Sequence, residues 1–345
     1  MGTLTLAASN SYSGSTVVNG GTLAVNGNAA IGGSTSFSVA DGATLQLNGT
    51  NADYYKWPAN AAPLAGAGTV TVPAIGRANV GFNFDMSAFT GVLNLAGGQF
   101  SVNPVHSPGI VSPVNGTISV GSNTTLYLGW TGSVLNTTVR LNSGMDNGEN
   151  LGVLRASTAT LNGAVILGTN STIGADGAFT INAAISDEGN GFGFTKVGSG
   201  TLILTSASNT YSGPTIVNSP ATLQCDTPGA LGGGPLSISG KANLNYVGTK
   251  SVASLTFAGV PQPGGTHGSI ASGAQFQSDT YFTPGSTGTV TVPSSYAGWA
   301  SGNAPGQTPG EDADNDGVDN GSSVSYTLPN GLGTRFVRLL VTPTP

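Results

Sequence analysis

The segments GTLIL (residues 200–204), SNTYSGPTIVN (208–218) and ATL (221–223) follow one another along the chain. Threonine and aliphatic residues alternate in these runs, which is the pattern of short β-strands with one buried face. Glycine, asparagine or proline stands close to the ends of the runs, where a chain can turn. The sequence therefore predicts very short strands that are joined by tight corners.

The spacing of equivalent leucines indicates how these strands are arranged. Leu202, Leu223 and Leu244 follow one another at intervals of 21 residues, and a second series that starts at Leu4 has intervals of 19 and 22. A period near twenty is typical of a solenoid, whose units bury their apolar faces only by stacking. We expect an all-β fold, a right-handed parallel β-helix (β-solenoid) with three short strands in each of roughly fourteen turns.

The composition agrees with a narrow coil of stacked strands. Glycine accounts for 55 and proline for 19 of the 345 residues, whereas charged residues make up only 7%. Corners require residues that adopt left-handed backbone conformations, which glycine and asparagine do most readily. With 38% hydrophobic residues and a net charge of −6, the chain is not a disordered polar polymer.

The sequence also excludes several classes of protein. It contains no run of eighteen apolar residues, so we expect no transmembrane segment. Nine scattered basic residues cannot form the patch that nucleic-acid binding requires. The single cysteine, Cys225, allows no intramolecular disulfide. The chain opens directly on GTLTL (2–6) without a signal peptide, and we expect that its natural N-terminus is missing.

The series of motifs quoted above occurs twice. GTLTL (2–6), SNSYSGSTVVN (9–19) and GTL (21–23) match the segments of residues 200–223 in order and in spacing. This arrangement resembles the autotransporter-associated β-strand repeat, also called the passenger-associated transport repeat. The two copies cover about residues 2–47 and 192–246.

The resemblance implies the role of the chain and its place in the cell. Proteins of this family are bacterial β-helix passengers with adhesive or scaffolding roles, located outside the cell or at the outer-membrane surface. Residues 255–292 resemble the ending that such passengers often carry. The open ends of a β-helix are unpaired strand edges, so self-association through the ends is a further expectation.

We expect three regions along the chain. Residues 1–293 would form the β-helix, 294–310 a linker, and 311–345 an acidic segment followed by a small β-hairpin or tail. Five of the 15 acidic residues fall between positions 311 and 319, which separates this last region from the rest of the sequence.

The acidic region contains a candidate calcium loop. The run DADNDGVDNG (312–321) follows the D-x-D-x-D-G pattern. The expected ligands are the carboxylates of Asp312, Asp314 and Asp316, the carbonyl oxygen of Val318 and the side chain of Asn320. The twelfth position, which normally supplies a bidentate carboxylate, is a serine, so the predicted Ca²⁺ site is incomplete and weak. The alternative is a solvated acidic linker without metal.

One cluster of aromatic residues is a candidate binding surface. Tyr54, Tyr55 and Trp57 lie close together in the run NADYYKWP (51–58). Exposed tyrosine and tryptophan rings stack on sugars or anchor a protein partner. The alternative is a loop that packs against the side of the rod.

The predicted function is that of a non-catalytic, adhesive or structural surface protein whose partner is a glycan or a protein. The alternatives are a carbohydrate-active β-helix enzyme, similar to polysaccharide lyases or hydrolases, and a passive glycan-binding module. An enzyme of that kind requires converging carboxylates or a base beside them. The nearest acidic pairs are Asp146 with Glu149 and Asp187 with Glu188. Their convergence in a groove with an arginine or lysine would favour the enzyme.

Overall fold

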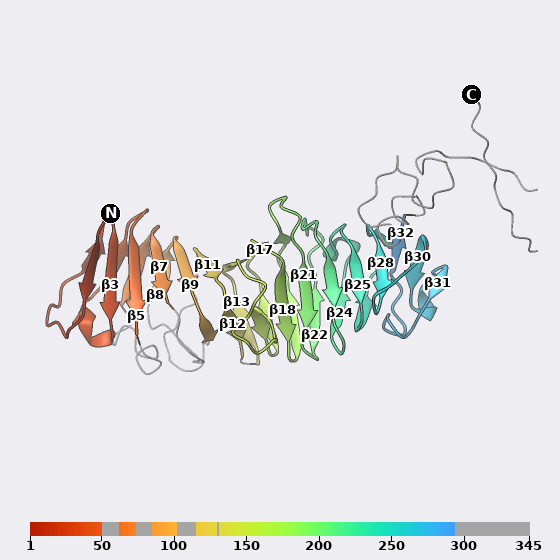
Figure 1. Cartoon of the computed structure of the whole chain (residues 1–345), viewed down its shortest axis with the longest axis horizontal. Helices are drawn as coiled ribbons and strands as arrows, with labels where there is room; N and C mark the ends of the chain where they lie inside the picture. The colour runs from red at the N-terminus through yellow and green to blue at the C-terminus, as the bar shows by residue number, and fades with distance from the viewer. Residues whose placement is uncertain (50–61, 74–84, 102–114, 130, 294–345) are drawn as a thin grey trace, which may run out of the picture.

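The computed structural model describes residues 1–49, 62–73, 85–101, 115–129 and 131–293. This part of the chain is an elongated rod of short strands lying side by side, with the N-terminus near one end and β31 (Phe276–Gln277) near the other (Figure 1). It is an all-β parallel solenoid of about 10 turns. The predicted fold class is therefore confirmed. The expected fourteen turns are too many because insertions lengthen individual turns, as the 26-residue spacing of the paired residues Val139 and Val165 illustrates.

Two sheets begin at the N-terminal end of the rod, and each is built from one strand per turn. Sheet B is the shorter of the two, and its strands are parallel throughout. Its strands are β2 (Thr16–Val18), β4 (Phe37–Val39), β6 (Pro63–Gly66) and β8 (Asp85–Phe89). Sheet A consists of β1 (Thr3–Leu6), β3 (Thr22–Asn26), β5 (Thr44–Asn48), β7 (Thr69–Val72), β9 (Val92–Leu95), β11 (Thr117–Val120), β14 (Thr138–Leu141), β17 (Val165–Leu167) and β20 (Ile185–Ser186).

Two further sheets form the faces of the middle and C-terminal turns. Sheet D consists of β13 (Ser133–Leu135), β16 (Ala159–Leu161), β19 (Ala178–Ile181), β22 (Thr201–Leu204), β24 (Thr222–Cys225) and β26 (Lys241–Leu244). Sheet C consists of β10 (Gly98–Ser101), β12 (Thr124–Leu128), β15 (Leu154–Ala156), β18 (Ser171–Ala175), β21 (Phe194–Val197), β23 (Thr215–Val217), β25 (Leu236–Ile238), β28 (Leu255–Phe257) and β29 (Val260–Pro261).

The register of the strands confirms most of the leucine spacing. In sheet A, Leu4 pairs with Leu23 and Leu23 with Leu45. In sheet D, Leu202 pairs with Leu223 as predicted. The next step differs, because Leu244 lies beside Cys225 in place of Leu223. Since side chains alternate between the two faces of a strand, this shift of two residues still directs Leu244 into the core.

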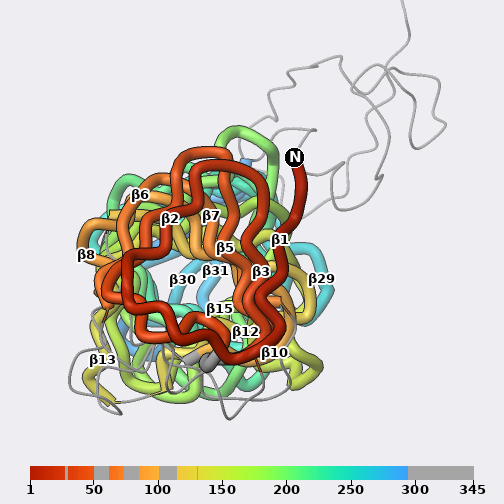
Figure 2. Tube along the Cα trace, turned by 90° about the vertical axis from the view of Figure 1, so that its left-hand side faces the viewer, coloured from red at the N-terminus to blue at the C-terminus, as the bar shows by residue number. Residues whose placement is uncertain are grey.

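The core is a continuous column of aliphatic side chains. Most strands bury every second residue, as the pattern of exposure along β22 and β24 shows. Figure 2 looks along the rod and shows successive turns lying over one another around a common centre. Each leucine or isoleucine buried in this way stabilises the fold by about 1.5–3 kcal/mol relative to an exposed side chain.

The corners between strands bring successive turns into very close contact. Gly68, Gly91 and Gly116 occupy equivalent corners before β7, β9 and β11. The amide groups of Val92 and Thr117 donate hydrogen bonds of 3.0 Å to the carbonyl oxygens of Gly68 and Gly91. A Cβ atom at Gly91 would overlap the carbonyl oxygen of Gly68, so this corner accepts only glycine.

Asparagine side chains join another row of corners. The amide of Asn162 donates to the side-chain oxygen of Asn136 at 2.8 Å, and the amide of Asn182 donates to Asn162 at 2.8 Å. The hydroxyl of Thr205 continues the row by donating to Asn182 at 2.9 Å. This ladder links four successive turns after the strands of sheet D.

The C-terminal end of the described rod is closed by a small mixed sheet. Here the chain leaves the parallel coil, because β29 runs antiparallel to β28 and β30 antiparallel to β32. Phe257 of β28 stacks on Tyr281 with the ring centroids 4.3 Å apart. Sheet E, which we call the terminal cap, consists of β27 (Thr249–Ser251), β30 (Gly265–Gly268), β31 (Phe276–Gln277) and β32 (Thr289–Val292).

Helical structure is limited to single turns among the residues described. They are the 3₁₀ helices η1 (Asn28–Ile31), η2 (Pro228–Ala230) and η3 (Ile270–Ser272). In the same residues, no helix is long and apolar enough to cross a membrane.

Candidate functional site: a groove on sheet C

The candidate site begins with an insertion between β14 and β15, residues 143–152. Val139 and its partner Val165 are 26 residues apart, whereas Val165 and Ile185 in the next turn are only 20 apart. The additional residues form a loop on the outside of the rod. Since the strands on both sides keep their register, the insertion changes the surface without disturbing the core.

The carboxylate of Asp146 organises this loop. Its Oδ1 accepts hydrogen bonds from the amides of Gly148 and Asn150 at 2.9 and 3.1 Å. Its Oδ2 accepts from the amides of Leu151 and Gly152 at 2.6 and 2.9 Å. Burial alone would raise the pKa of Asp146, but the four amide donors outweigh it and hold that pKa below its ordinary value of 3.8.

The loop is attached to the sheet beneath it at two points. The hydroxyl of Thr125 donates to the side-chain oxygen of Asn147 and to the carbonyl oxygen of Gly152, both at 3.2 Å. Leu151 passes directly over Gly174 of β18, where a Cβ atom would overlap the Leu151 carbonyl oxygen. Gly174 therefore stands in the middle of a strand because the loop backbone needs that space.

A groove of about 480 Å³ lies between this loop and the outer face of sheet C. On the loop side it is lined by Met145, Asn147 and Asn150, and Asn123 borders it in the corner before β12. The sheet side is formed by the side chains of Thr172 and Thr195 and, two residues further along the strands, of Val197 and Asn218. The groove therefore crosses several turns of the rod.

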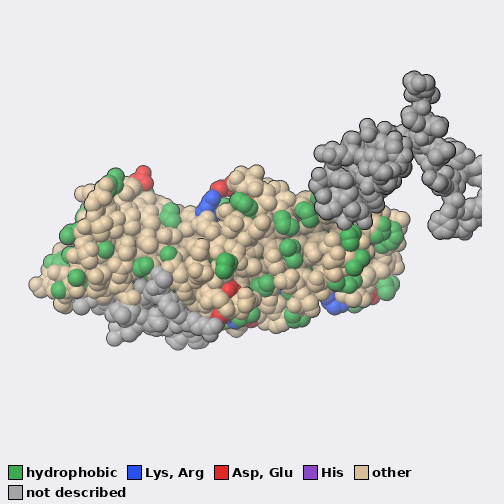
Figure 3. Space-filling view, viewed as in Figure 1, with side chains coloured by type: hydrophobic (Ala, Val, Ile, Leu, Met, Phe, Trp, Pro, Cys, Tyr) green, Lys and Arg blue, Asp and Glu red, His purple; other side chains and the backbone are tan. Residues whose placement is uncertain are grey.

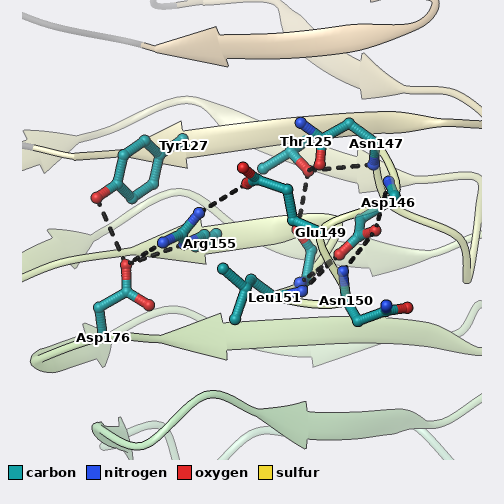
Figure 4. Close-up of polar contacts among 11 residues, drawn as sticks. Thr125, Tyr127, Asp146, Asn147, Glu149, Asn150, Leu151, Arg155 and Asp176 are labelled. Atoms are coloured by element: carbon teal, nitrogen blue, oxygen red, sulfur yellow. Dashed lines mark hydrogen bonds and ion pairs between the residues drawn. The ribbon is translucent and has the colours of Figure 1, made fainter. Parts of the chain in front are cut away.

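A charged cluster lies beside the loop. The guanidinium of Arg155 donates to Glu149 through Nη1 at 2.8 Å and to Asp176 through Nε at 2.9 Å. Its Cζ lies 4.6 Å from the ring centroid of Tyr127, a cation–π arrangement. Figure 4 shows Arg155 between the two carboxylates, with Asp146 directed toward the backbone of its own loop.

The second acidic pair is built in the same manner. Asp187 is only 1% exposed, and its carboxylate accepts hydrogen bonds from Gly189, Gly191 and Phe192 amides and from both the amide and the hydroxyl of Ser212. Burial raises the pKa of Asp187, but the hydrogen-bond donors lower it by more, so the pKa lies below its ordinary value of 3.8. Glu188 forms an ion pair of 2.9 Å with Arg140.

This geometry gives the enzyme alternative little support. The carboxylate of Asp146 is occupied by backbone amides and that of Asp187 by backbone amides and the Ser212 hydroxyl, and Glu149 and Glu188 pair with different arginines. Glu149 does approach Asp176, but the guanidinium of Arg155 fills the space between them. Glycoside hydrolysis requires two carboxyl groups with room for the sugar between them.

The other sequence candidates lie elsewhere. The aromatic cluster of Tyr54, Tyr55 and Trp57 falls outside the described residues, as do all five predicted calcium ligands, Asp312, Asp314, Asp316, Val318 and Asn320. Over residues 1–293, with the gaps given above, no three histidine, cysteine or acidic side chains come together as a metal site would require.

The sequence did not reveal the groove itself. Thr172, Thr195 and Asn218 look like ordinary outward residues of three different repeats, and only stacking brings them together. Two signals were present in retrospect: the long interval between β14 and β17, and an aspartate followed two residues later by glycine at Asp146. The latter pattern is typical of turns in which a side chain bonds its own backbone.

Comparison with known proteins gives an independent indication. The model of the passenger-associated transport repeat matches residues 1–25 and 194–220. The chain is also 35% identical over 104 residues to the adhesin BmaC autotransporter of Brucella suis biovar 1 (strain 1330). That match covers 30% of the chain and 3% of the length of the adhesin. No solved structure matches the chain.

Proposed function

We propose that this chain is a non-catalytic adhesive segment of a passenger protein displayed outside a bacterial cell. The β-solenoid fold, the two matched repeats and the similarity to an autotransporter adhesin support this role. The observation that carries the proposal is the recurrence of the repeat at two places along one continuous rod. The whole passenger would then present its surface loops at a distance from the membrane.

The physical basis of adhesion is an elongated scaffold whose surface carries few charges. Stacked turns contact only their neighbours, so the rod holds its length while the corners carry loops of different size. The face shown in Figure 3 has few charged side chains among many neutral ones. A surface of this kind binds through hydrogen bonds and shape, with little contribution from long-range charge.

Surface display tests this proposal directly. The full chain is fused to an outer-membrane display anchor in a non-adherent bacterial host, and adherence to epithelial cells and to abiotic surfaces is counted. We expect adherence well above that of cells displaying an unrelated rod of similar length. Equal adherence of the two strains, at equal surface expression, contradicts an adhesive role.

The absence of catalysis needs its own measurement. Purified protein is incubated with pectin, xylan, cellulose and peptidoglycan, and the release of reducing ends and of unsaturated products is followed. We expect no release above that of heat-denatured protein, and reproducible release would favour the enzyme alternative.

The weak calcium site at Asp312–Asn320 also stays a prediction, which calorimetric titration with Ca²⁺ tests.

A further inference from the structure

We propose that the groove between the loop of residues 143–152 and sheet C binds an uncharged glycan chain lying along the axis of the rod. This inference rests on the adhesive role proposed above and specifies the ligand class for one site. It follows from four properties of the groove: its free hydrogen-bonding groups, its apolar rim, its lack of free charge and its direction.

The free hydrogen-bonding groups are amides and hydroxyls. Within the described part of the chain, the side chains of Asn150, Thr195 and Asn218 have no hydrogen-bond partner, although each lines the groove. The Nδ2 atom of Asn147 is buried without a partner as well. Each carboxamide offers donors and an acceptor, and each hydroxyl offers both. This mixture matches the hydroxyl groups of a sugar, which are themselves donors and acceptors.

The rim of the groove supplies apolar contact. Met145 of the loop is 70% exposed, and Val197 lies on the sheet side. Flexible thioether and aliphatic groups pack against irregular apolar surfaces, such as the C–H faces of a sugar ring. Met145 is too exposed to stabilise the core. Its thioether is instead available for contact with a ligand in the groove.

The electrostatics favour a ligand without charge. Asp146, the one ionisable residue in the described part of the lining, directs its carboxylate to four backbone amides. The nearby guanidinium of Arg155 is occupied by Glu149 and Asp176. Among the residues that the structure describes, no lysine or arginine lines the groove, so an anionic polysaccharide would find no cation in this part of it.

The direction of the groove selects a linear polymer. Thr195 of β21 lies next to Thr172 of β18, and Asn218 follows β23, which is the next strand along the sheet. Neighbouring strands are about 4.8 Å apart, so each successive turn contributes one polar group to the floor, with Asn218 set two residues further along the strands than Thr195. A peptide is less suitable, because β18 and β21 are paired on both sides and offer no free backbone edge for strand addition.

A glycan array tests the assignment with the full chain. The probes are linear neutral oligosaccharides of four to eight sugars, including β-1,4-linked glucose, xylose and N-acetylglucosamine, together with sialylated and sulfated oligosaccharides. We compare the native chain with Thr195→Ala/Asn218→Ala and with Thr195→Trp, which fills the groove. The matched control is Thr160→Ala/Thr180→Ala, whose residues lie side by side on the outer face of sheet D.

The expected result is binding of neutral oligosaccharides by the native chain and the sheet D control. The double variant should bind at least ten times more weakly, and Thr195→Trp should abolish binding, while circular dichroism melting confirms that each variant is folded. Three outcomes overturn the proposal: no neutral probe is bound, charged probes are bound preferentially, or the groove variants bind as well as the native chain. If adherence in the display assay persists in those cases, the adhesive role stands and only the groove assignment fails.

Discussion

Single carboxylates shape the surface loops of this rod at the residue scale. Asp146 and Asp187 are both buried, and each is surrounded by amide donors from the few residues that follow it. Left-handed backbone conformations at Gly148, Asn150 and Gly152 turn those amides toward the Asp146 carboxylate. A short loop thereby acquires a fixed shape without a hydrophobic core of its own.

Replacing Asp146 by alanine should destabilise the protein by about 2 kcal/mol, because four amides lose a charged acceptor. The exposed Asp41→Ala serves as the control and should leave the urea midpoint unchanged. Since the folded-state pKa of Asp146 lies below 3.8, its stabilisation is present above that pH and is lost as the pH falls through the lower value. The free energies of unfolding of the native and variant proteins should therefore become equal in strong acid. A stability difference that persists there would contradict this assignment.

Lys196 is the other unusual residue, a lysine with no exposed surface in a core position of β21. Its Nζ donates to the carbonyl oxygens of Val197 and Gly198 at 2.6 and 3.1 Å. Burial lowers the pKa of Lys196 to about 8, and the negative charge of Asp176 offsets only part of that effect. Lys196 falls within the second repeat copy, residues 192–246, but the sequence did not show that its side chain faces inward.

The stability of the native chain should rise with pH relative to Lys196→Met. Between the folded-state pKa of about 8 and the ordinary value of 10.5, the unfolded chain holds a proton that the folded protein has released. From pH 7 to pH 9 we expect a relative gain of about 1 kcal/mol. Burial raises the pKa of Cys225, which acts in the opposite direction above pH 9 but is common to both proteins. Urea unfolding measures the free energy of unfolding of both proteins at the two pH values. An equal difference between native protein and variant at pH 7 and pH 9 would show that Lys196 does not titrate in this range.

At the scale of the elements, the corners limit the sequence more strictly than the strands do. The strands tolerate the two-residue shift at Leu244, because the alternation of side chains is preserved. The corner at Gly91 tolerates no side chain, because the carbonyl oxygen of Gly68 occupies the place of a Cβ atom. Corner glycines therefore fix how closely successive turns approach one another.

Gly91→Ala should destabilise the fold by about 1–3 kcal/mol, the usual cost of inserting an atom into a packed site. Gly233→Ala is the matched control, since nothing lies within 4 Å of its added Cβ atom. Thermal unfolding followed by circular dichroism compares the two variants with the native chain. An equal effect at both glycines would mean that chain entropy, and not close contact, governs the substitution.

The strands were predictable from the sequence because their signal is local. Alternation and the interval near twenty residues sufficed for the solenoid and for the Leu4, Leu23 and Leu45 column. The number of turns was not predictable, since insertions such as residues 143–152 lengthen single turns. The groove was hidden for a related reason, because Thr172, Thr195 and Asn218 become neighbours only through stacking.

At the scale of the whole molecule, the terminal cap determines how the rod ends. β28 stacks parallel on β25, but β29 then runs antiparallel to β28, and in sheet E β30 runs antiparallel to β32. Phe282 is fully buried, and it forms a bridge with Ala242 of β26. The cap thus covers the apolar interior with a non-repeating structure, as terminal units of solenoids generally do.

Removing the cap should expose strand edges and cause self-association. The truncated chain 1–248 is compared with 1–293, which keeps the cap and has the same N-terminal end. We expect 1–293 to stay monodisperse and 1–248 to form concentration-dependent oligomers, both measured by size-exclusion chromatography with light scattering. Monomeric behaviour of 1–248 up to high concentration would show that the cap is not needed to protect the end.

The insertion at residues 143–152 has a consequence for engineering and for evolution. The paired strands before and after it keep their alignment although this turn is six residues longer than the following one. New specificities can therefore arise by exchanging one peptide segment at a time, without redesign of the underlying coil. Peptide segments can therefore be inserted at this corner without disturbing the coil, and foreign epitopes placed there should be presented in a defined orientation.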